Sequence, residues 1–192
     1  MTYVIEVLRQ EHRNIEKLLQ VLEQELSVFD RGDRPEYEVI VRVFDYFREY
    51  PDSCHHPKED MIFDKLKSRD PAAAEKMGDL RAEHEEEASR LRHAAQAIDR
   101  VLGDQDLLRE TVGDIIRDFI AHERQHMNME ELIFFPTALD ALQPTDWADI
   151  ALKLADRCDP LNGPDLEQKF GMLRRKILEM EAEVEVERLT LI

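Results

Sequence analysis

The stretch HMNMEELIFFP, residues 126–136, places polar and apolar side chains on one face of a single predicted helix. His126 and Glu130 are one helical turn apart, and Ile133 and Phe134 follow on the same face. An imidazole and a carboxylate that lose their hydration without partners destabilise a fold by roughly several kcal/mol each. A metal ion between such side chains would remove that cost, so the stretch points to a metal site inside a helical fold.

The pattern occurs twice in the chain. Residues 55–63, HHPKEDMIF, match residues 126–134, HMNMEELIF, and RQEH at 9–12 matches RAEH at 81–84. An offset of 71 residues separates the first pair of motifs and an offset of 72 separates the second. Two motifs that repeat in one register indicate a duplicated pair of helices.

The periodicity of the apolar residues predicts an all-α fold with no strands. We expect helices at about 2–29, 36–68, 71–102 and 105–142, and shorter ones at about 145–157 and 165–189. The first four would form an up-down-up-down four-helix bundle, residues 1–143, followed by a helical extension, residues 144–192. The extension could pack on the bundle or on a second chain, so a homodimer is possible.

Two histidines occupy core positions of this predicted bundle. His12 lies in a stripe of isoleucine and leucine residues spaced three and four apart, and His84 lies in a similar stripe of the third helix. Together with the repeated motif, six side chains that can bind metal would face the interior. They are His12, His55, Glu59, His84, His126 and Glu130.

Imidazole and carboxylate ligands together suit iron, manganese or zinc better than calcium or magnesium. Two carboxylates can bridge two ions while each ion takes about two imidazoles, an arrangement that helical bundles use for dinuclear sites. The six side chains therefore predict a site for two metal ions.

These residues resemble the motif of the hemerythrin-like, or HHE cation-binding, family over about residues 2–142. The resemblance implies two non-haem iron ions bridged by Glu59, Glu130 and an oxygen atom, although manganese or zinc could occupy the same ligands. If one coordination position of such a pair stays open, the protein would bind O₂ or NO for carriage, sensing or stress protection. The alternatives are an oxidoreductase acting on hydrogen peroxide or NO and an iron storage or sensing protein, so enzymatic activity is left open.

Several neighbouring residues have two interpretations. His122 could be a further metal ligand or could orient His126, from which it is one turn away. His56 is expected to be a neighbour of the site and not a ligand, unless Pro57 distorts the helix. Glu87 could support the site or could pair with an arginine.

For other residues near the motifs the sequence supports one interpretation each. Asp60, His93 and Glu131 are expected to face solvent. Because proline removes a backbone hydrogen bond, Pro51 and Pro57 predict a kink or bulge near Cys54–Lys58.

The composition limits the partners and the location of the protein. There are 43 acidic and 26 basic residues, and the net charge of −17 disfavours nucleic acid and anionic membranes. Charged residues early in the chain argue against a signal peptide or a membrane anchor. Cys54 and Cys158 form no disulfide framework, which favours a reducing, cytoplasmic location, with a single bridge between them as the alternative.

Overall fold

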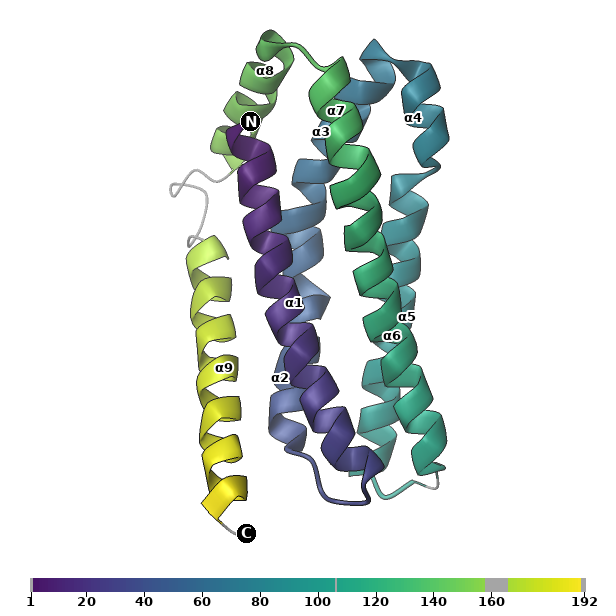
Figure 1. The fold of residues 1–192 in the computed structure, drawn as a ribbon, viewed down its shortest axis with the longest axis vertical. Helices are drawn as coiled ribbons and strands as arrows, with labels where there is room; N and C mark the ends of the chain where they lie inside the picture. The colour runs from purple at the N-terminus through teal and green to yellow at the C-terminus, as the bar shows by residue number, and fades with distance from the viewer. Residues whose placement is uncertain (1, 106, 158–165, 191–192) are drawn as a thin grey trace.

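The computed structural model describes residues 2–105, 107–157 and 166–190, and every regular element in these ranges is helical (Figure 1). The prediction of an all-α helical bundle is confirmed. The predicted loop at 159–164 and Cys158 lie outside the described residues. None of the described helices combines the length and the apolar character that crossing a membrane requires.

Four rods form the bundle. The first is α1 (Tyr3–Asp30), and the second consists of α2 (Tyr37–Tyr50), the π-helical turn η1 (Pro51–His55) and α3 (His56–Arg69). The third is α5 (Leu80–Leu102), preceded by the short α4 (Pro71–Met77). The fourth consists of α6 (Arg109–Met129), the π-helical turn η2 (Glu130–Phe134) and α7 (Phe135–Ala141), and the chain continues in α8 (Pro144–Arg157) and α9 (Leu166–Thr190).

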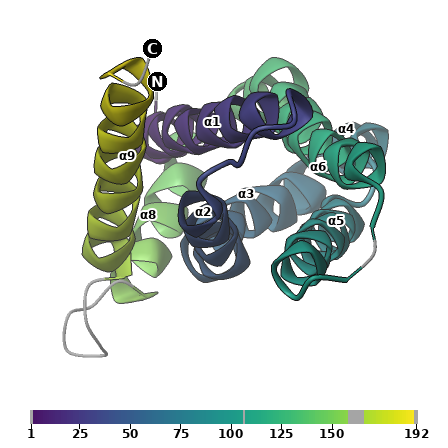
Figure 2. The same cartoon turned by 90° about the horizontal axis from the view of Figure 1, so that it is seen from below.

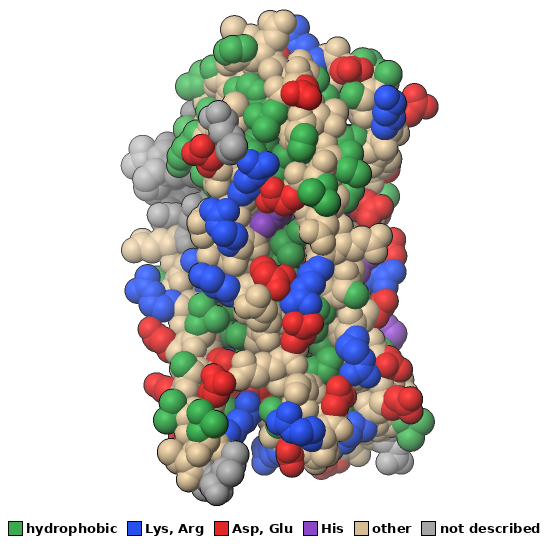
Figure 3. Space-filling view, in the orientation of Figure 1, with side chains coloured by type: hydrophobic (Ala, Val, Ile, Leu, Met, Phe, Trp, Pro, Cys, Tyr) green, Lys and Arg blue, Asp and Glu red, His purple; other side chains and the backbone are tan. Residues whose placement is uncertain are grey.

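Each rod packs against two others. Helix α1 contacts α2 and α6, and α5 contacts the same two helices, so the four rods surround a common interior (Figures 1 and 2). On the face shown in Figure 3, acidic and basic side chains are interspersed over the rods. The negative net charge is therefore not gathered into one acidic patch on that face.

The interior contains two separate apolar clusters. The upper cluster, in the view of Figure 1, includes Leu8 and Phe134, and the lower cluster includes Ile15 and Phe119. His12 falls between Leu8 and Ile15 along α1, so it lies in the layer between the clusters. The predicted metal ligands are therefore held in a polar layer with apolar packing on both sides.

The predicted helix at 71–102 is divided into α4 and α5, and this part of the prediction is wrong. Gly78 has a φ of +77°, a conformation that side chains with a Cβ rarely adopt, and it ends α4. Asp79 then begins α5, because its carboxylate accepts hydrogen bonds from the backbone N–H groups of Arg81 and Ala82.

Two π-helical turns interrupt the second and fourth rods. The turn η1 lies where the prolines predicted a distortion, and Pro57 follows its last residue, His55, after one intervening residue. The turn η2 was not predicted, and Pro136 follows it in the same way. A proline ring clashes with the carbonyl group four residues earlier, and the wider π turn gives the ring room.

The turn η2 also corrects the expected orientation of Ile133. Ile133 is 53% exposed, whereas Phe134 and Phe135 are buried. A π turn needs about one residue more than an α turn. The inward face after Glu130 is therefore taken by Phe134 and Phe135.

The two C-terminal helices pack on the bundle. Helix α8 contacts α3, and the guanidinium group of Arg69 donates two hydrogen bonds of 2.9 Å to the carboxylate of Asp146. Helix α9 contacts α2 and α1, and it adds Phe170 and Ile177 to the lower apolar cluster. The extension therefore shares the apolar interior of the bundle.

A buried pair of carboxylates lies between α9 and α1. Glu25 accepts hydrogen bonds from Arg188 at 2.8 Å and from the backbone N–H of Glu36 at 2.6 Å. Glu181 is buried nearby, with Arg188 Nη1 3.9 Å from its Oε1 atom. Burial and the adjacent carboxylate of Glu25 raise the pKa of Glu181 to about 8.

Glu181 is therefore expected to make stability depend on pH. Between its ordinary pKa of 4.5 and about 8, the unfolded chain releases a proton that the folded protein retains, so stability falls as pH rises through this window. The substitution Glu181→Gln should flatten this dependence and stabilise the fold by about 2 kcal/mol above pH 8, a value reduced from the full pKa shift by solvent screening. Urea unfolding at several pH values measures it.

The exposed Glu183 on the same helix provides the control. Glu183→Gln should leave the pH dependence of the parent protein in place. Identical pH profiles for the parent and Glu181→Gln would contradict the expectation.

Candidate metal centre

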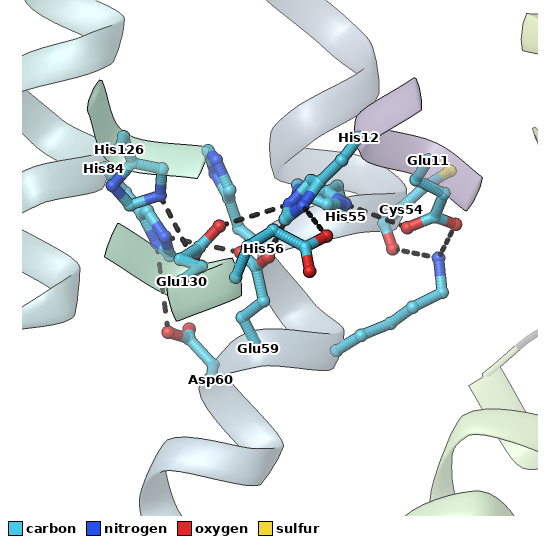
Figure 4. Close-up of polar contacts among 12 residues, drawn as sticks. Glu11, His12, Cys54, His55, His56, Glu59, Asp60, His84, His126 and Glu130 are labelled. Atoms are coloured by element: carbon cyan, nitrogen blue, oxygen red, sulfur yellow. Dashed lines mark hydrogen bonds and ion pairs between the residues drawn. The ribbon is translucent and has the colours of Figure 1, made fainter. Parts of the chain in front are cut away.

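Six side chains from all four rods converge in the polar layer (Figure 4). They are His12 from α1, His55 from η1, Glu59 from α3, His84 from α5, His126 from α6 and Glu130 from η2. We call them the inner set. Each is at most 8% exposed, and both glutamates are fully buried. The structure thus brings together six of the seven residues that the sequence analysis proposed as ligands.

The inner set divides into two groups that share both glutamates. His12 and His55 belong to the first group, and His84 and His126 belong to the second. In each group, one candidate ligand atom from every member lies within 4.8 Å of the others. This spacing allows one ion in each group.

The two carboxylates direct separate oxygen atoms toward the two groups. Glu59 Oε1 lies 3.0 Å from His55 Nε2, and Glu59 Oε2 lies 3.5 Å from His84 Nε2. Glu130 Oε2 lies 3.2 Å from His12 Nε2, and Glu130 Oε1 lies 3.2 Å from His126 Nε2. Each glutamate would therefore offer one oxygen atom to each group.

Buried atoms without hydrogen-bond partners test whether a metal fits. Both carboxylate oxygens of Glu59 and of Glu130 are buried and form no hydrogen bond. The same holds for the Nε2 atoms of His12, His84 and His126. Most buried polar atoms in proteins have partners, so this concentration of unsatisfied atoms is what metal ions would complete. The donor set fits a pair of cations.

The family comparison agrees with this geometry. The family model described as the hemerythrin HHE cation-binding domain matches residues 3–138. The chain belongs to the hemerythrin HHE cation-binding family. Neither the comparison with curated proteins nor the comparison with solved structures gives a match.

Four further acidic side chains of this HHE domain face the outer ring nitrogens, and we call them the outer carboxylates. Glu11 accepts a hydrogen bond of 2.8 Å from His55 Nδ1, and Glu131 accepts one of 3.0 Å from His12 Nδ1. Glu87 Oε1 lies 3.2 Å from His126 Nδ1, and Asp60 Oδ1 lies 4.0 Å from His84 Nδ1. A carboxylate at Nδ1 fixes the ring and leaves Nε2 free to bind metal.

The sequence analysis placed two of the outer carboxylates wrongly, left the role of one open and did not identify the fourth. The expectation that Asp60 and Glu131 only face solvent is wrong, since each faces a histidine of the inner set. Glu87, which had two interpretations, faces histidines instead of an arginine.

Glu11 was not identified from the sequence. Its position beside His12 places it about 100° away around the helix, so periodicity assigns it to another face. It is buried because Lys58, also buried, donates hydrogen bonds of 2.7 Å to its carboxylate and of 2.6 Å to the carbonyl of Cys54.

Electrostatics hold protons on His12 and His126 in the metal-free protein. Burial lowers the pKa of His12, but its contacts with Glu130, Glu131 and Glu59 outweigh burial and raise it to about 11. Burial likewise opposes the charge of His126, and Glu130 and Glu87 raise its pKa to about 10. Metal ions must displace these protons in order to bind.

Two other histidines lie outside the two groups. His122 is half-buried and its Nε2 atom is buried without a hydrogen-bond partner, but it is not brought together with the inner set. Its role as a ligand remains a prediction. His56 is buried and its ring stacks on that of His84, with 3.7 Å between centroids. His93, as expected, is exposed.

A cavity of about 310 Å³ lies beside the second group. Its lining extends from exposed residues to buried ones. The exposed part includes Arg48, Asp52 and Arg92, and the buried part includes His56, Glu87 and Glu123. Glu123 was not identified from the sequence, and burial together with the nearby Glu87 raises its pKa well above the ordinary value.

Removal of an outer carboxylate should weaken metal binding. In Glu11→Gln, His55 Nδ1 loses its charged acceptor, and we expect metal affinity to fall about 10- to 100-fold while the fold is retained. Competition with a chelator of known affinity, monitored with Fe²⁺ or Zn²⁺, measures the change.

Glu6 lies on the same helix but is exposed, so Glu6→Gln is a matched control with the affinity of the parent protein. Unchanged affinity in Glu11→Gln would show that this contact does not support the centre.

Proposed function

We propose that this HHE protein holds two non-haem iron ions and uses them to bind O₂ or NO, for carriage, sensing or stress protection. The observation that supports the proposal best is the sharing of Glu59 and Glu130 between two histidine pairs. Imidazole and carboxylate donors suit iron, with manganese or zinc as alternatives that depend on metal supply. Iron bound there would supply redox chemistry and positions for a small ligand.

Three features of the chain support this role: the candidate ligands, the carboxylates that orient them and the apolar surroundings. The Nε2 atoms of the four histidines and the oxygens of the two glutamates would hold the ions, and the outer carboxylates orient the rings. Around them, the two apolar clusters limit the access of water. Charged products need water to solvate them, so a site with little water disfavours their release from a bound neutral molecule.

A second candidate function is a diiron oxidoreductase that acts on hydrogen peroxide or NO. The cavity beside the second group favours it, because its buried lining includes the polar side chains of His56, Glu87 and Glu123 beside the apolar Phe47 and Leu91. A polar approach suits a hydrogen-bonding substrate better than an apolar gas.

Metal analysis and kinetics test the two candidates in sequence. Elemental analysis of protein from iron-replete cells should give about two irons per chain, and less than one would contradict both candidates. The reduced protein is then mixed with O₂, NO and peroxide in a stopped-flow instrument. A stable adduct that reverses under vacuum supports binding, whereas sustained loss of peroxide supports the oxidoreductase. The cytoplasmic location and the homodimer remain predictions of the sequence.

The shared glutamates make a specific prediction about stoichiometry. His126 belongs to one group only, so His126→Ala should reduce the metal content from about two ions per chain to about one. Glu130 belongs to both groups, so Glu130→Ala should weaken both ions and reduce the content well below one. Elemental analysis after dialysis measures both.

His93→Ala changes an exposed histidine and should keep the metal content of the parent protein. Equal losses in His126→Ala and Glu130→Ala would argue against two ions that share bridging carboxylates.

A further inference from the structure

The two halves of the candidate centre are enclosed differently. At the first group, the ring of Phe135 stacks on His12 with 5.5 Å between centroids and an angle of 12°. Phe135 is fully buried, and the buried ion pair of Glu11 and Lys58 lies behind His55. Within the described residues, no side chain of α1 lines the cavity, although α1 carries His12. The first group is thus covered by Phe135, by this ion pair and by Glu131, which is 30% exposed and accepts a hydrogen bond from His12. None of these side chains lines the cavity.

The second group is separated from the cavity by two side chains. The His56 ring stacks on His84 at 3.7 Å, and Glu87 Oε1 lies 3.2 Å from His126 Nδ1. Both His56 and Glu87 also line the cavity, and His56 Nε2 lies 3.3 Å from Glu87 Oε2. A molecule in the cavity is therefore one layer of side chains away from the second group.

We propose that this cavity is the entrance by which a small, uncharged, hydrogen-bonding molecule, of which hydrogen peroxide is the simplest, reaches the half of the centre formed by His84 and His126. The inference rests on the proposed function and deepens its second candidate. It states which half of the centre the molecule reaches, by which route, and to which chemical class the molecule belongs.

Size and polarity support this ligand class. A volume of about 310 Å³ equals roughly ten water molecules, which is enough for peroxide but at the low end for organic ligands. The buried part of the lining combines the apolar Phe47 and Leu91 with an imidazole and two carboxyl groups that can form hydrogen bonds. The exposed part of the lining carries both signs of charge, Arg48 and Arg92 beside Asp52, so it favours neither anions nor cations over an uncharged molecule. An apolar gas gains nothing from the hydrogen-bonding groups.

Ala88 allows the entrance to be narrowed without changing the inner set or the outer carboxylates. It lines the cavity from α5 and is half-buried, so a larger side chain there would extend into the cavity. Ala88→Leu and Ala88→Phe introduce side chains of increasing size. If the Phe variant misfolds, the Leu variant still tests the proposal. Ala82→Phe is the matched control, because Ala82 lies on the same helix, is exposed and does not line the cavity.

Two readouts follow access to the centre. The first is the water-proton relaxation rate of the Mn²⁺-loaded protein, which reports water exchange near the metal without any redox reaction. The second is the rate at which peroxide oxidises the reduced, iron-loaded protein. We expect Ala88→Phe to slow the peroxide reaction at least about fivefold and to reduce relaxation, because peroxide must then await side-chain motion. Ala88→Leu should have a smaller effect in both readouts, and Ala82→Phe should match the parent protein.

The outcomes separate this inference from the proposed function. A parent protein without bound metal would overturn both. Normal metal content with unchanged relaxation and peroxide rates in both Ala88 variants would overturn the entrance alone. Faster reaction in Phe135→Leu, with no effect at Ala88, would place the entrance at the first group instead. If NO slowed as much as peroxide in Ala88→Phe, the assignment of a hydrogen-bonding ligand would be wrong.

Discussion

The fully buried carboxylates of Glu59 and Glu130 are the constraint on which the rest of the structure depends. Buried carboxylates are costly without compensating groups, and imidazoles from all four rods lie within 3.7 Å of these two. Despite its burial, the surrounding histidines lower the pKa of Glu59 well below its ordinary value. In the metal-free protein His12 and His126 hold protons beside these carboxylates, and metal ions would replace the protons.

The bundle tolerates this polar layer because it keeps the layer narrow. Apolar clusters lie on both sides, so the cost of the polar groups is confined to one level of the interior. Both π turns occur at this level, and they supply His55 and Glu130. Such turns are frequent at functional sites, because the extra residue redirects side chains that an α-helix would point elsewhere.

The helical fold and the inner set could be predicted because they depend on local periodicity and on a repeat of two motifs. The break at Gly78 and the exposure of Ile133 could not, because one depends on a single φ angle and the other on an unpredicted π turn. Glu11 was missed because its burial depends on Lys58, which comes from another rod. Residues beside a ligand become predictable only when the partner helix is known, since spacing along one helix does not reveal contacts between helices.

The repeat also explains where the two halves of the centre differ. The histidine and glutamate ligands are repeated, so the two groups of the inner set are alike. Glu11 has its counterpart in Glu83, but Glu83 is exposed, and Glu87 from one turn later faces the second group instead. That shift leaves His56 beside Glu87 and next to the cavity, whereas the corresponding side of the first group is filled by Lys58. Divergence outside the ligand set is therefore sufficient to give two similar groups of candidate ligands different surroundings.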